Sequence, residues 1–210
     1  MRKETVLKII GLLRRDLSKG FTILEISKLL NIGYRPAYNH ISELGQNKII
    51  LIKKVGHSKQ CFLRLENTQA RHYLQEVDLL RKEELYKNNK KIKAILEELF
   101  PKIMDHIVAS LHSIILFGSY AKGTATKSSD VDLLFIVSDI KDKIVRDKIE
   151  RECVSYQRSH RVKISPLIAD IKEFKKMLKS KEMNVGKETK KYGIALYGLE
   201  QFWRIISWSE

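Results

Sequence analysis

Residues 116–137 read LFGSYAKGTATKSSDVDLLFIV and place a Gly-Ser pair between two short apolar runs. The first run spans residues 113–117 and the second spans residues 131–137. Both are rich in β-branched and aromatic side chains and are bounded by Gly, Ser, Lys and Thr, a composition typical of buried strands. The segment therefore predicts two strands joined by a turn or a short helix.

Two aspartates, Asp130 and Asp132, stand one residue apart where the second predicted strand begins. Because successive side chains of a strand point to opposite faces, we expect both carboxylates on the same face. Two like charges so close favour protonation of one group unless a cation lies between them. Oxygen ligands suit Mg²⁺, which takes one or two carboxylates together with substrate phosphates. The expected cofactor is Mg²⁺ or, in its place, Mn²⁺.

Gly118 and Ser119 follow directly after the first predicted strand. A glycine at this position lets the backbone approach a ligand closely. Backbone N–H groups of the following turn and the Ser119 hydroxyl can then bind phosphate oxygens. Together with the aspartates, this pair predicts a site for a metal-bound nucleotide. The alternative is an ordinary strand-turn-strand unit in which Asp130 enters the strand and Asp132 is solvated.

The stretch GSYAKGTATKSSDVDLLFIV resembles the signature of the DNA polymerase beta-like nucleotidyltransferase superfamily in its minimal bacterial and archaeal form. The resemblance covers residues 92–210 and includes YGIALYG at residues 192–198, which is similar to the terminal strand and turn of these domains. It implies an α+β domain over residues 107–210, with a mixed β-sheet flanked by helices.

The resemblance also implies an activity and a set of site residues. Asp130 and Asp132 would be catalytic and would bind two Mg²⁺ ions, and the phosphates of an NTP would lie against Gly118 and Ser119. The implied reaction transfers a nucleoside monophosphate to a hydroxyl or a phosphate and releases pyrophosphate, with the metals stabilising the attacking and leaving oxygens.

The resemblance implies a third carboxylate, which active members of this superfamily supply from a later strand, where it holds the second metal and helps deprotonate the nucleophile. The corresponding segment here, RVKISPLI at residues 161–168, contains no acid, and Lys163 or Ser165 occupies the expected position. Asp170 lies just beyond it and could become the third metal ligand if Pro166 shifted the strand register. The alternative is that Asp170 caps a helix that begins near residue 171. Nucleotide binding therefore follows from the residues more directly than turnover does.

The first 67 residues show a different pattern, with apolar residues at helical spacing followed by two strand-like runs. Thr22 opens a capping box, Gly33 is expected to end the second helix with a positive φ, and Pro36 is expected to begin the third. The predicted elements are helices over residues 5–13 and 22–30 and from Pro36 onward, and a hairpin made by residues 49–54 and 61–65.

Residues 1–67 resemble a winged helix-turn-helix domain in the order of these elements, which implies double-stranded DNA as a partner. Asn and Gln can pair with adenine edges, and Arg with guanine or phosphate. The candidate DNA-binding residues are Arg35, Tyr38, Asn39, Ser42 and Gln46 on the third helix and Lys53, Lys54 and Lys59 on the wing. The segment holds 13 Lys and Arg against 5 Asp and Glu, an excess that suits a polyanion. The alternative is a domain for protein contacts or dimerisation.

Residues 68–106 are expected to form a helical linker whose charged middle is either exposed or packed in a homodimer. The 210-residue chain carries a net charge of +15 and has no run of eighteen apolar residues and no signal peptide. We therefore expect a cytoplasmic protein with no membrane partner. Cys61 and Cys153 lack metal-ligand spacing, and a reduced, structural role is expected.

Two functions remain open from the sequence. The first is an enzyme that binds Mg-NTP and transfers a nucleotidyl group to an unidentified acceptor, a protein hydroxyl or a small molecule, while the winged helix binds DNA. The second is a DNA-binding transcriptional regulator whose nucleotidyltransferase domain has lost turnover and senses nucleotide. Ser165 or Lys163 in place of the third acid favours the regulator, whereas Asp170 in the metal site would favour the enzyme.

Overall fold

The computed structural model describes residues 3–209, with only the backbone of His106 described. The chain divides into two compact units, Met1–Val77 and Asp78–Glu210. The division falls within helix α4, Thr68–Asn88. Each unit has its own buried core.

The first unit combines three helices with a small antiparallel sheet. Its elements are α1 (Lys3–Leu13), the 3₁₀ turn η1 (Arg14–Asp16), β1 (Phe21–Thr22), α2 (Ile23–Leu29), α3 (Tyr34–Gln46), β2 (Ile50–Val55) and β3 (Ser58–Leu63). The strands are ordered β1-β3-β2. Fully buried side chains from each helix, such as Ile9, Ile26 and Ile41, form the core. The three helices and the hairpin expected from the sequence are present.

The helix ends in this unit differ in detail from the sequence prediction. Thr22 caps α2 as predicted, because its hydroxyl accepts a hydrogen bond from the Glu25 amide at 3.1 Å and completes a capping box. The prediction of a positive φ at Gly33 is wrong: Gly33 is the extended N-cap of α3, with φ −60°, and Asn31 takes the positive φ instead. Helix α3 consequently begins at Tyr34, two residues before Pro36.

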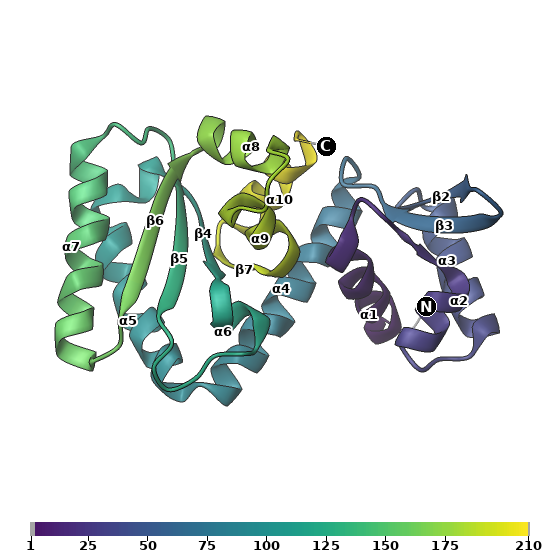
Figure 1. Cartoon of the computed structure of the whole chain (residues 1–210), viewed down its shortest axis with the longest axis horizontal. Coiled ribbons are helices and arrows are strands. Elements are labelled where there is room, and N and C mark those ends of the chain that lie inside the picture. The colour runs from purple at the N-terminus through teal and green to yellow at the C-terminus, as the bar shows by residue number, and fades with distance from the viewer. Residues whose placement is uncertain (1–2, 210) are drawn as a thin grey trace. The chain divides into compact units, whose positions relative to one another are not determined.

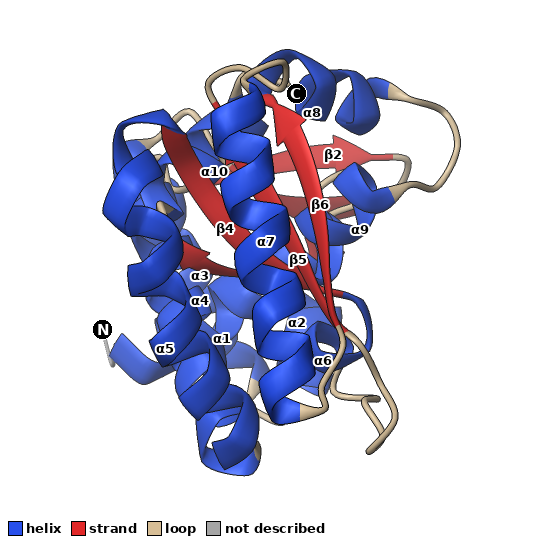
Figure 2. Cartoon of the chain, turned by 90° about the vertical axis from the view of Figure 1, so that its left-hand side faces the viewer, coloured by secondary structure: helices blue, strands red, loops and turns tan. Residues whose placement is uncertain are grey.

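The second unit is a four-stranded sheet with helices on its faces (Figures 1 and 2). Beyond the end of α4, its elements are α5 (Lys90–Ile107), the 3₁₀ turn η2 (Val108–Ser110), β4 (Leu111–Phe117), α6 (Gly118–Lys122), β5 (Val131–Val137), α7 (Lys143–His160), β6 (Ile164–Asp170), α8 (Ile171–Lys179), α9 (Val185–Tyr192), β7 (Ile194–Tyr197) and α10 (Leu199–Ser207). Helix α5 lies within the segment predicted as a helical linker, and its apolar face, including Ile95 and Leu99, is buried in the core of this unit.

The sheet is mixed, as predicted. Its strands are ordered β6-β5-β4-β7, with β4 antiparallel to both β5 and β7 and β5 parallel to β6 (Figure 1). Helices α5 and α7 lie side by side against one face (Figure 2). The opposite side holds an aromatic cluster in which the rings of Phe174 on α8 and Phe202 on α10 are 6.1 Å apart.

Alternation along β5 determines which residues face the α5–α7 layer. Leu133 and Phe135 are fully buried in the core cluster that contains these two helices. Residues at even positions therefore point to the opposite face of the sheet, and this places Asp130 and Asp132 on that face together. The packing of the core thus presents the two carboxylates on one side, as the sequence predicted.

Candidate functional site

The candidate site lies where β4 ends and β5 begins. Phe117, the last residue of β4, pairs with Asp132 across the antiparallel ladder. The chain then turns at Gly118, whose φ of +68° is left-handed. A Cβ atom at this position would lie 2.1 Å from Oδ2 of Asp132. Only glycine therefore allows the turn to lie against this carboxylate, and the predicted phosphate-binding turn and the predicted metal ligand belong to one site.

The environment of Asp132 disfavours its negative charge. Burial raises the pKa of this carboxyl, and the negative charges of Asp130 and Glu188 raise it further. The positive charges of Lys163 and Lys122 act in the opposite direction. A cation placed beside Asp132 would relieve this repulsion, as the sequence analysis expected for paired carboxylates.

Two side chains from the β6 side bind Asp130. Ser165 lies directly opposite Asp132 in the parallel register, at the position where a third acid was expected. Its hydroxyl donates a hydrogen bond to Oδ2 of Asp130 at 3.3 Å. Lys163 forms an ion pair with the same oxygen, and this hydrogen bond raises the pKa of the ammonium group. Oδ2 of Asp130 is thus already occupied by a positively charged donor.

Asp170 is not the third carboxylate. The β5–β6 register continues through Pro166 without a shift and pairs Asp170 with Val137, at the far end of the strand from Asp132. At about 3.3 Å per residue, this places the two aspartates on the order of 16 Å apart along the strand. The Asp170 carboxylate instead accepts a hydrogen bond from the Glu173 amide at 2.8 Å and caps α8. The metal-ligand hypothesis for Asp170 is therefore wrong, and the capping alternative is confirmed.

An ion pair that the sequence analysis missed lies close to Asp132. Nζ of Lys122 in α6 lies 2.6 Å from Oε1 of Glu188 in α9. The charges of both side chains affect the pKa of Asp132. Glu188 stands outside every motif in the sequence, and only the packing of α9 beside α6 brings it near. No local sequence signal would have identified it.

Arg81 of α4 holds the helices that carry this ion pair. Its guanidinium donates hydrogen bonds to the carbonyls of Tyr192 and Gly193, both at 2.7 Å, and to that of Ala121 at 3.1 Å. These carbonyls lie at the end of α9 and within α6. Arg81 belongs to the predicted helical linker of residues 68–106, and its hydrogen bonds give it a positioning role next to Lys122.

The donor set fits one divalent cation better than two. Carboxylate oxygens are the ligands that Mg²⁺ prefers, and Asp132 together with Oδ1 of Asp130 supplies them. Oδ2 of Asp130 already accepts bonds from Lys163 and Ser165. Within the part of the chain that the structure describes, no group of three or more His, Cys, Asp or Glu side chains is placed to hold a metal ion.

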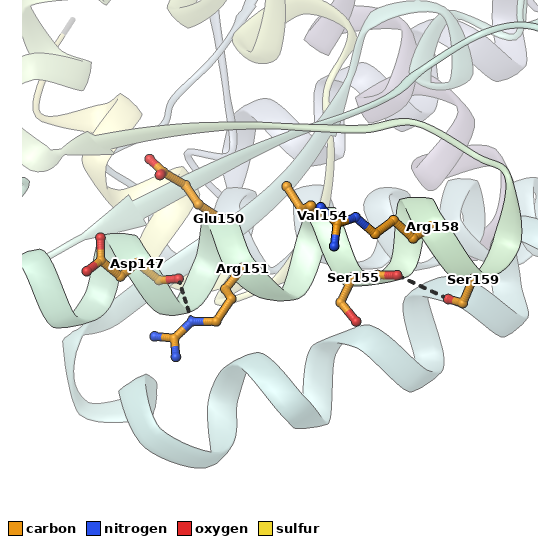
Figure 3. A pocket seen from close by; sticks show the side chains of 7 residues that line it. All are labelled: Asp147, Glu150, Arg151, Val154, Ser155, Arg158 and Ser159. Carbon is orange, nitrogen blue, oxygen red and sulfur yellow. Dashed lines mark hydrogen bonds between the residues drawn. The ribbon is translucent and has the colours of Figure 1, made fainter.

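Two hollows of the second unit have linings that do not include Asp130 or Asp132. A hollow of about 780 Å³ runs along α7 (Figure 3). Its lining comes from this one helix and has balanced charges, with Asp147 and Glu150 against Arg151 and Arg158. A smaller hollow of about 310 Å³ lies beside α6 and is lined in part by Arg81, Tyr120 and Lys122. Only the second adjoins the Gly118 turn.

The candidate DNA-binding residues of the first unit lie on its surface. Ala37, Ile41 and Leu44 form the buried stripe of α3, as predicted. The opposite side carries exposed Arg35, Tyr38, Asn39 and Gln46 and half-buried Ser42. On the hairpin, Lys53, Lys54 and Lys59 are exposed. Lys54 of β2 stands directly opposite Lys59 of β3 in the antiparallel register.

Comparisons with known proteins identify a family match within the second unit. The family described as "Nucleotidyltransferase domain" matches residues 89–192. Two proteins of Methanocaldococcus jannaschii, each named "Putative protein adenylyltransferase", are similar to the chain. One is 40% identical over 85 residues, which are 40% of this chain and 58% of that protein. The other is 31% identical over 100 residues, which are 48% of this chain and 93% of that protein.

The chain therefore spans less than two thirds of the first relative and nearly all of the second. A solved structure described as "Crystal structure of the toxin-antitoxin with AMP-PNP" aligns with 58% of this chain and 85% of its own, at 22% identity and a TM-score of 0.34. A TM-score this low does not establish a shared fold.

No helix within residues 3–209 is long and apolar enough to cross a membrane.

The contact between Gly118 and Asp132 predicts a specific stability defect. Gly118→Ala should destabilise the second unit more than Gly123→Ala does, by about 1–3 kcal/mol, the usual cost of overpacking. Gly123 is a matched control, because its φ is also left-handed, at +74°, but a Cβ there would meet nothing within 4 Å. Denaturant unfolding followed by tryptophan fluorescence measures the free energy of unfolding of the second unit, because both tryptophans, Trp203 and Trp208, lie in it.

A double-mutant cycle tests whether the Asp132 carboxylate causes the loss of stability in Gly118→Ala. In an Asp132→Ala background the carboxylate is absent, so Gly118→Ala should lose most of its excess cost. An equal cost of Gly118→Ala in both backgrounds would contradict the close approach.

Proposed function

The chain belongs to the nucleotidyltransferase domain family, and we propose that its second unit transfers an adenylyl group from ATP to a hydroxyl group of a protein. The observation that carries the proposal is the close approach of the Gly118 turn to Asp132, which joins a turn able to bind phosphate with a carboxylate able to bind a cation. The name of the two archaeal relatives supports the choice of nucleotide and of acceptor.

The residues of the site have distinct roles in this proposal. The backbone N–H groups that follow Gly118 and the hydroxyl of Ser119 bind the triphosphate. Asp130 and Asp132 hold Mg²⁺ or Mn²⁺, and a bound divalent ion supplies the positive charge that stabilises the transferring phosphoryl group. Glu188 neutralises Lys122 by their ion pair and keeps the cluster close to charge balance.

The reaction itself needs one bond made and one broken. The acceptor oxygen bonds to the α-phosphorus while the bond from that phosphorus to the bridging oxygen breaks, so that pyrophosphate leaves. The hydroxyl proton passes to water, because Ser165 stands where a third carboxylate could have taken it. A general base typically contributes about 10²–10⁴-fold, so transfer by the native protein should be slow.

A second function is favoured by the surroundings of Asp130. Lys163 and Ser165 occupy its Oδ2 where an active site would offer a third acid. This arrangement supports a transcriptional regulator that binds nucleotide without turnover. The first unit supports the same role, because its element order and exposed basic hairpin fit a winged helix that binds double-stranded DNA. A homodimer would let two such units reach two half-sites.

Adenylyl transfer is tested with α-³²P-labelled ATP, Mg²⁺ and a cell extract that supplies acceptors. The native protein should label a protein acceptor, and Asp130→Asn with Asp132→Asn should abolish labelling, because the carboxylates that hold the cation are gone. Asp147→Asn with Glu150→Gln is the matched control, since it removes the same charge from the exposed surface of α7. ATP binding without any labelled product would favour the regulator, and labelling by the Asp130 and Asp132 variant would overturn the site assignment.

DNA binding is tested on the full-length protein through its salt dependence. Lys53→Ala with Lys54→Ala should weaken binding to duplex DNA and lower the slope of log K against log salt by about 0.9 for each phosphate that is no longer neutralised. Lys172→Ala with Lys181→Ala removes the same charge from exposed positions of the second unit and should leave the slope unchanged. The absence of DNA binding by the native protein at low salt would indicate a protein-contact role for the first unit.

A further inference from the structure

We propose that the ammonium group of Lys163 is a resident cation that replaces one of two divalent ions, so that the site takes up a single divalent cation with its nucleotide. The inference rests on the nucleotide binding proposed above and concerns how the site balances its charge. It starts from the disagreement between the donor set of this chain and a two-metal site.

The backbone places Lys163 on the face of the sheet that carries the aspartates. Its carbonyl accepts a hydrogen bond from the Val131 amide at 2.8 Å, directly before β5 and β6 become paired. Lys163 precedes Ser165 by two residues, and Ser165 is paired with Asp132. Strand alternation therefore directs the Lys163 side chain toward the same face as Asp130 and Asp132.

The contact with Asp130 occupies a position where a metal would bind. The ammonium group and the Ser165 hydroxyl both donate to Oδ2 of Asp130. An ammonium group has three donors and no acceptor, so it cannot itself be a metal ligand. A second divalent ion at this oxygen would have to displace Lys163 or lie against its positive charge.

The charge of the site is the same in both arrangements. Three carboxylates with two divalent ions leave one net positive charge toward the triphosphate. Two carboxylates, one ammonium group and one divalent ion also leave one net positive charge. The Lys122–Glu188 ion pair does not change this balance, because its own charges cancel. Loss of the third acid and the presence of Lys163 therefore compensate each other electrostatically.

The proposal gives the single divalent ion the carboxylate oxygens that Lys163 and Ser165 do not contact. Asp132 lies against the Gly118 turn, whereas the donors at Oδ2 of Asp130 come from the β6 side. An ion held by Asp132 and Oδ1 of Asp130 would lie between the carboxylates and phosphates bound at the turn. The Lys163 side chain, 58% exposed, remains a point charge within reach of the same phosphates.

Mn²⁺ titration of the full-length protein without nucleotide tests the role of Lys163. In Lys163→Met the carboxylates lose their neutralising neighbour, and Mn²⁺ affinity, measured by the EPR signal of free Mn²⁺, should rise by roughly tenfold because a nearby unit charge has been removed. Lys143→Met, at an exposed position at the start of α7, is the matched control and should leave the affinity unchanged. Equal Mn²⁺ affinity in the native protein and Lys163→Met would overturn the proposal, whatever the protein does with ATP.

Counting the ions with saturating ATP tests the stoichiometry. After subtraction of the Mn²⁺ held by ATP that is free in solution, the native protein should hold one Mn²⁺ per chain. The variant Lys163→Met with Ser165→Asp, which restores a third carboxylate, should hold two. Two ions bound by the native protein would overturn the resident-cation assignment. A protein that binds no ATP, but whose Mn²⁺ affinity still responds to Lys163→Met, would overturn the proposed function and leave the charge assignment supported.

Discussion

Repulsion between the carboxylates of Asp130 and Asp132 is the constraint on which the rest of the site depends. Core packing of β5 against α5 and α7 presents both groups on one face, and burial raises the pKa of Asp132. Such a pair stays doubly ionised only with compensating positive charge, and without it one carboxyl group is protonated. Lys163 supplies that charge at Asp130, and Lys122 lies near Asp132. A divalent ion held beside Asp132 would add to the same compensating positive charge.

The turn and the paired aspartates could be predicted because their causes are local. A glycine after an apolar strand and two acids at i and i+2 are visible in the sequence, and strand alternation places the acids on one face. The cap at Thr22 is local in the same way. These elements require no knowledge of which distant segments meet.

The remaining parts of the site depend on contacts between distant segments. Glu188 lies near Asp132 only because α9 packs beside α6. Arg81 donates hydrogen bonds to the carbonyls of Tyr192 and Gly193, which are more than a hundred residues further along the chain. Asp170 was a candidate because a bulge at Pro166 could have moved it, but β6 is an edge strand, where proline needs no bulge. The β5–β6 register places Ser165 beside Asp132, and the ion pair with Asp130 places Lys163 at the same site, where the third acid was expected.

The Gly118 turn and the aspartate pair are proposed to form one nucleotide site. Calorimetric titration of ATP into the native protein, once with Mg²⁺ and once with EDTA, tests it most directly. One ATP should bind per chain, and more tightly when Mg²⁺ is present, because the metal would relieve the repulsion between the triphosphate and the carboxylates. No saturable binding under either condition, or binding that Mg²⁺ leaves unchanged, would contradict it.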